Sequence, residues 1–129
     1  MDQFDRERLV QTWIDRHADP ALSELSQAKE PDQRFWAWER LDALVREEPE
    51  VAWSAILEIL QRTRSEQALD NLAAGPLEDL LAKHGYQFID RVEAEATRSS
   101  LFRHLLAGVW QNAMSGELWE RVQAACKEA

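Results

Sequence analysis

The residues best suited to catalysis or metal binding are the three histidines. His17 and His84 each fall on an apolar face near the C-terminal end of an expected helix, where an imidazole can serve as a metal ligand or a general base. A histidine at that position also interacts favourably with the last helix carbonyls without doing any chemistry. The sequence contains no His-x-x-x-His, Glu-x-x-His or His–Cys spacing. We therefore expect no metal site, no catalytic residue and no cofactor.

Glu78 and Asp79 are the most enzyme-like carboxylates, directly after a Gly-Pro turn. Adjacent residues point about 100° apart on a helix, and acids in a first turn already stabilise the helix dipole. Asp90 and Glu93 share a helix face and would suit a cation or a basic partner. No nucleophile motif, phosphate loop or dinucleotide fingerprint accompanies them. A hydrolase-like enzyme or small-ligand binder that combines these carboxylates with His84 remains the alternative.

Six tryptophans in 129 residues are the unusual feature of the composition. Trp36 lies about 160° around its helix from Trp38. It is therefore either covered by a second layer of helices or exposed as an anchor for a partner. Trp110 flanks an apolar stripe and is expected to be half-exposed. The tryptophans on inward stripes, which we expect in the core, are Trp13, Trp38, Trp53 and Trp119.

The apolar spacing is helical throughout, and prolines, glycines and serines punctuate it. Pro31 is expected to open a helix, Gly75 to end one, Gly85 to form a left-handed cap, and Gly108 to sit inside a helix where another helix approaches closely. The expected helices are 5–17, 21–28, 31–47, 50–62, 65–74, 77–84 and 86–96, followed by two capped by Ser99 or Ser100 and by Ser115. Helix 50–62 is apolar on most sides and should be central. We predict an all-α fold of about nine short helices packed as stacked antiparallel hairpins, HEAT-like or irregular.

The length fits one helical domain over residues 1–129, with residues 1–30 as an N-terminal helical extension. The net charge of −9 is spread along the chain. The absence of a basic patch argues against nucleic acid and anionic membrane as partners and favours a basic one. Lone Cys126 excludes an internal disulfide. The charged N-terminus lacks the apolar stretch of a signal peptide, and we expect a cytoplasmic protein.

Two segments, Leu-Ala-Ala-Gly-Pro-Leu-Glu-Asp-Leu-Leu at 72–81 and Val-Trp-Gln-Asn at 109–112, resemble a family of small bacterial helical proteins, a domain of unknown function. The resemblance covers roughly residues 35–125 and implies a bacterial source but no activity. It implies where a site should be sought: Asn71, Glu78, Asp79, His84, Asp90, Trp110, Gln111 and Asn112.

The sequence favours a non-enzymatic, acidic protein-binding module, such as an inhibitor, an immunity-type protein or an adaptor. A third hypothesis is a homodimeric structural protein in which a second copy covers Trp36 and Trp110. The residues predicted to bind are Trp36, Asn71, Glu78, Asp79, Asp90, Trp110, Gln111 and Asn112.

Overall fold

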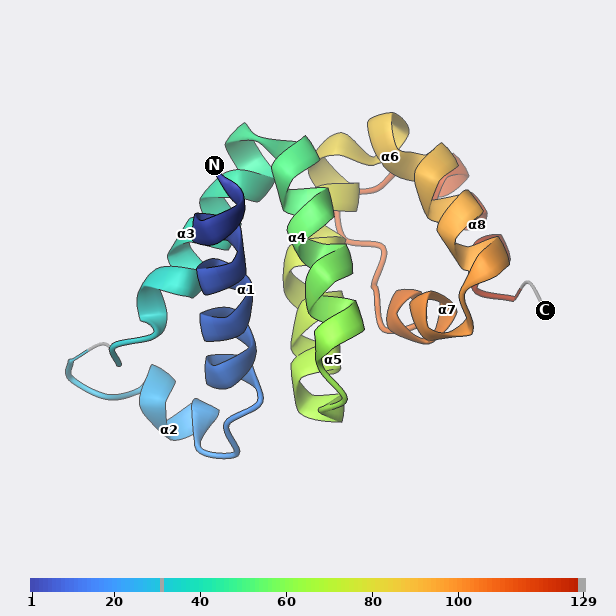
Figure 1. Cartoon of the computed structure of the whole chain (residues 1–129). Helices are drawn as coiled ribbons and strands as arrows, with labels where there is room; N and C mark the ends of the chain where they lie inside the picture. The colour runs from blue at the N-terminus through green and yellow to red at the C-terminus, as the bar shows by residue number, and fades with distance from the viewer. Residues whose placement is uncertain (31, 128–129) are drawn as a thin grey trace.

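The computed structural model describes residues 1–30 and 32–127, which form eight α-helices and one π-helical segment with no strand among them (Figure 1). The all-α prediction is confirmed. The elements are α1 (Gln3–His17), α2 (Leu22–Ser26), α3 (Phe35–Glu47), α4 (Pro49–Arg62), α5 (Glu66–Leu72), η1 (Ala73–Leu77), α6 (Glu78–Arg98), α7 (Ser100–Leu106) and α8 (Gly116–Cys126).

Helix α4 lies at the centre of the molecule, as its apolar surface predicted. It packs against α1, α3, α6, α7 and η1, and it buries Trp53, Ile56 and Ile59. In Figure 1, α1, α3 and α4 lie side by side, while α7 and α8 pack with α6 at the other end. One hydrophobic core runs through all of these elements, from Leu9 in α1 to Ala125 in α8. No helix within the described residues is long and apolar enough to cross a membrane.

Three serine caps begin the helices where the sequence predicted. The Ser65 hydroxyl accepts from the Ala68 N–H, at 3.1 Å. Ser99 begins α7 in the same way, at 3.0 Å, and Ser115 begins α8, at 3.1 Å. Each cap satisfies one of the N–H groups that the first turn of a helix leaves without a partner.

The predicted break at residues 74–77 is wrong. Gly75 and Pro76 lie inside the π-helical segment η1, which joins α5 to α6 without a loop. The helices expected at 77–84 and 86–96 do meet where the sequence predicted: the backbone leaves helical geometry at His84 (φ −133°, ψ 25°), and α6 is kinked there. Gly85 is not a left-handed cap, because no glycine in the described residues has a positive φ. A Cβ there would lie 2.2 Å from Leu118 Cδ2, so Gly85 allows α8 to approach α6.

Two further boundaries differ from the predictions. Gly108 follows α7 rather than lying inside it, although the predicted close approach exists: a Cβ at Gly108 would lie 2.9 Å from Ala73 Cβ in η1. The third main helix begins at Phe35. Pro31, which was expected to open that helix, lies outside the described residues.

The tryptophan predictions hold for Trp13 and Trp53, which are buried, and partly for Trp119, which packs half-buried on the core. Trp38 is 42% exposed, so its predicted place in the core is wrong. The side of α3 that faces the core carries Ala37 instead of Trp38. The buried residues of α3 are Ala37, Leu41, Leu44 and Val45.

Candidate functional site

Three cavities share the half-exposed indole of Trp38. The largest, about 410 Å³, lies beside Phe35 and extends to Leu25 and Lys29. The second, about 200 Å³, is lined by Gly75 and Pro76 of η1 together with residues of α1 and α5. The third, about 130 Å³, has two carboxylates and two indoles in its wall: Trp13, Trp38, Asp42, Val45, Gly75, Pro76 and Asp79. We call the three cavities together the Trp38 groove.

The Trp38 ring belongs to a stack that also contains Phe35 and Arg16. Its centroid lies 5.4 Å from that of Phe35, and the two planes differ by 8°. The guanidinium of Arg16 lies over the Phe35 ring, 5.3 Å from the centroid. A largely buried cation thus holds Phe35, and Phe35 in turn orients Trp38 with part of its indole in solvent.

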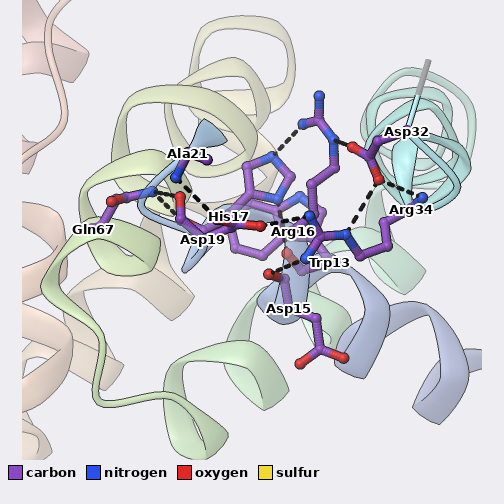
Figure 2. Close-up of polar contacts among 9 residues, drawn as sticks. All are labelled: Trp13, Asp15, Arg16, His17, Asp19, Ala21, Asp32, Arg34 and Gln67. Carbon is purple, nitrogen blue, oxygen red and sulfur yellow. Dashed lines mark hydrogen bonds and ion pairs between the residues drawn. The ribbon is translucent and has the colours of Figure 1, made fainter. Parts of the chain in front are cut away.

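An ion-pair network anchors this stack, with Asp32 between two arginines (Figure 2). Arg16 Nε donates to Asp32 Oδ2 at 3.0 Å, and Arg34 Nε donates to Asp32 Oδ1 at 3.2 Å. Burial raises the pKa of the Asp32 carboxyl, but hydrogen bonds from Arg34 and Arg16 outweigh it and hold that pKa below its usual range. Arg34 also donates to Asp19 Oδ2 at 2.8 Å. The network ties the start of α3 to the end of α1.

Helix α5 supplies hydrogen-bond donors to the carbonyls at the C-terminal end of α1, which have no partner within that helix. Gln67 Nε2 donates to the His17 carbonyl at 3.0 Å and to the Asp19 carbonyl at 2.6 Å (Figure 2). Asn71 Nδ2 lies 3.4 Å from the His17 carbonyl and donates to the Gln67 carbonyl at 2.9 Å. Asn71, a predicted site residue, therefore links α5 to the end of α1 and also lines the groove.

His17 is buried and serves the structure as a neutral side chain. Its ring stacks on Trp13 at 3.8 Å, and its Nδ1 lies 2.8 Å from the Trp13 carbonyl, which can only accept. Its Nε2 is therefore the acceptor for Arg16 Nη1, at 3.3 Å. Burial above all, together with the charge of Arg16, lowers the pKa of His17 to about 4, against an opposing effect of the Trp13 carbonyl. At neutral pH the ring carries no charge.

The acidic end of the groove lies where η1 leads into α6. Burial raises the pKa of the Asp79 carboxyl. The charge of Lys83 opposes this shift, and the weaker effects of Asp42 and then Glu78 raise the pKa further. The indole Nε1 of Trp13 is buried and has no hydrogen-bond acceptor among residues 1–30 and 32–127. π-helical turns are frequent at functional sites, and this one brings Gly75 and Pro76 to the groove.

Among the predicted site residues, Asn71 and Asp79 line the Trp38 groove, while a second group organises a different loop. Glu78 accepts from the Trp110 backbone N–H at 2.9 Å and from Asn112 Nδ2 at 3.1 Å. Asn112 has a φ of 50°, and Gln111 donates to the Met114 carbonyl. These contacts fix the connection between α7 and α8.

The remaining predicted residues lie elsewhere. Arg8 of α1 lies over the ring of Trp36, 5.1 Å from its centroid, so Trp36 is half-buried rather than a free anchor. Asp90 pairs with Arg121 at 3.0 Å. His84 Nε2 lies 2.9 Å from the Val45 carbonyl. Glu78, Asp90 and His84 thus engage separate partners, and among the described residues they form no common cluster with Asp79.

Sequence reasoning missed the role of Trp38 and of Phe35 beneath it. The signal was present, because Ala37 begins a helical stripe of its own with Leu41, Leu44 and Val45, which leaves Trp38 at the edge of the buried face. Within residues 1–30 and 32–127, no group of three or more His, Cys, Asp or Glu side chains is placed to hold a metal ion.

A family model described as "Family of unknown function (DUF6869)" matches residues 24–129, which is most of the chain. No curated protein and no solved structure matches.

Proposed function

The chain belongs to DUF6869, a family of unknown function, and we propose that it is a protein-binding module whose interface is the Trp38 groove. The observation that carries the proposal is the half-exposed Trp38, which the Phe35 stack holds in a fixed orientation at the meeting point of three cavities. Rigid tryptophans beside pockets are typical hot spots of protein interfaces.

The shape of the groove favours an extended segment of a partner over a compact metabolite. The cavities are partly open to solvent and share Trp38; Leu25 and Lys29 line one of them, and Asp79 lines another. Small-molecule sites usually enclose most of the ligand in one concave pocket. A chain of pockets with an aromatic centre instead matches alternate side chains of a bound peptide.

The charge of the molecule favours a basic partner. The net charge is −9, and two carboxylates line one end of the groove. Such a field raises the association rate of a positively charged partner at low salt. The alternative of an enzyme receives less support, because Glu78, Asp90 and His84 are each engaged with other groups.

A peptide selection tests the proposal. Random peptides of about twelve residues, displayed on phage, are selected on the immobilised protein and counter-selected on Trp38→Ala. We expect enriched peptides that bind the wild type at least about 30-fold more tightly than Trp38→Ala, since a hot-spot residue contributes about 2 kcal/mol or more.

Trp110→Ala is the matched control, because Trp110 is 74% exposed and lines none of the three cavities. It should bind the selected peptides like the wild type, and circular dichroism should show that both variants are folded. A selection that yields no Trp38-dependent peptide contradicts the proposal. Light scattering of the wild type and of Trp38→Ala at two concentrations tests the homodimer: a dimer that Trp38→Ala abolishes would mean that a second copy covers the groove, which would also contradict the proposal.

A further inference from the structure

The smallest cavity of the Trp38 groove has the walls of a site for an organic cation. Its volume is about 130 Å³, close to the roughly 150 Å³ of an engineered cavity that holds benzene. It can therefore accept the end of one side chain. The indoles of Trp13 and Trp38 contribute aromatic surface, and Asp42 and Asp79 contribute the charge.

Neither carboxylate has a strong partner of its own. Among the residues that the structure describes, Asp42 is paired only along its own helix, with Arg46 at 3.7 Å, and its side chain is 36% exposed. Asp79 forms no ion pair within the part of the chain that the structure describes, and burial raises the pKa of its carboxyl. Two like charges that line one cavity repel each other, and a bound cation would remove that repulsion.

The two indoles are the second feature that indicates an organic cation. Trp13 is 1% exposed and stacks on His17 at 3.8 Å, and it lines this cavity and its neighbour. Trp38 is held by its stack on Phe35, with 5.4 Å between the ring centroids. Aromatic faces held in place beside carboxylates are a combination that favours an organic cation.

We propose that this cavity binds the cationic side chain of an arginine or lysine in the partner segment. Its charge pairs with Asp42 and Asp79, and the Trp38 indole packs against it. This inference rests on the proposed function, because it assigns one residue of the bound segment. A hard metal ion fits less well, because it requires six or more oxygen ligands and these walls are largely apolar.

The test uses N-acetyl-arginine methylamide, and N-acetyl-citrulline methylamide as its uncharged counterpart. ¹⁵N-labelled protein is titrated with each compound, and the indole N–H resonances of Trp13 and Trp38 are followed. We expect saturable shifts with the arginine compound and at least about 10-fold weaker binding of citrulline, as a loss of 1.4 kcal/mol implies. Nα-acetyl-lysine methylamide, which keeps its charged side-chain amine, should bind like the arginine compound.

Asp79→Asn should weaken arginine binding at least about 5-fold, since it removes one of the two charges. Asp70→Asn changes the net charge equally at an exposed position on α5 that lines none of the cavities, and it should bind like the wild type. Equal binding of arginine and citrulline, or equal binding by the two variants, overturns the inference.

The two proposals fail separately. If Trp38-dependent peptides are selected but the arginine compound causes no shifts, the groove binds protein and the cation site is wrong. If the arginine compound binds as expected but no Trp38-dependent peptide is selected, the cation site stands and the protein-binding function is wrong.

Discussion

Buried His17 should make the folded protein sensitive to acid. Its Nε2 accepts from Arg16 Nη1 at 3.3 Å, and its ring is stacked on Trp13. A proton on Nε2 would end that hydrogen bond and place an imidazolium beside the guanidinium. Asp32 faces the pair and favours the charged form, while Arg34 opposes it. The perturbation is acidification, compared between the wild type and His17→Asn, whose amide can still donate to the Trp13 carbonyl.

The magnitude follows from the two pKa values of His17. The folded pKa is about 4, against 6.5 for a free imidazole. Because the folded value is the lower one, stability is fully present above pH 6.5 and is lost as the pH falls toward 4. At about 1.4 kcal/mol per pKa unit, His17 should remove about 2 kcal/mol from the free energy of unfolding by pH 5 and about 3 kcal/mol by pH 4.

Urea unfolding between pH 7 and pH 4 measures the effect. The free energy of unfolding of the wild type should fall by about 3 kcal/mol more than that of His17→Asn. Subtracting the variant removes the contribution of the acids, which the two proteins share. His104→Asn, the same change at an exposed position, should retain the wild-type loss because His17 is intact. Parallel curves for the wild type and His17→Asn would refute the assignment of a buried neutral imidazole.

Three further predictions concern the free energy of unfolding. Asp32→Ala should lower it by about 3 kcal/mol, since it leaves the buried Arg16 without its carboxylate; a change below 1 kcal/mol in chemical denaturation would contradict this. Gly85→Ala should lower it by about 1–3 kcal/mol through overlap with Leu118, and Leu118→Ala should cost less in that background than in the wild type. Asp79→Asn should raise it at pH 7, because a carboxyl with a raised pKa is least favourable when ionised, and the gain should vanish toward pH 4; a gain that is independent of pH would argue against this.

Local chemistry made much of the fold predictable. The serine caps at Ser65, Ser99 and Ser115 act through hydrogen bonds to residues three positions away, so their signal lies within one turn of sequence. The central place of α4 follows from its composition alone, because a helix that is apolar on most sides must be covered on most sides.

The features that sequence reasoning missed depend on distant parts of the chain. Rules based on neighbouring residues predict a helix cap at Gly85. Its small size instead allows contact with Leu118, a residue 33 positions later. The large ring of Trp38 outweighs Ala37 in any hydrophobic pattern, although the small residue is the one that faces the core. Side-chain size predicts burial poorly where two helices approach closely.

The candidate site was predicted only in part. Asn71 was identified through a family resemblance, and Asp79 both through that resemblance and as a carboxylate after the Gly-Pro turn; both line the groove. Trp13 and Trp38 were assigned to inward packing stripes, and the shared cavities became visible only when α1, α3 and η1 were brought together. No spacing in the sequence reports a contact of that kind.

The π-helical segment Ala73–Leu77 also controls the rotational phase between two helices. Each residue added to or removed from a helix turns everything after it by about 100°. Removal of the exposed Ala74 would therefore turn the face of α6 that carries Asp79 away from α3, or force α5 to unwind instead. A length change of one residue at this point would redirect the acidic end of the groove without altering any residue that lines the cavity of Asp42 and Asp79.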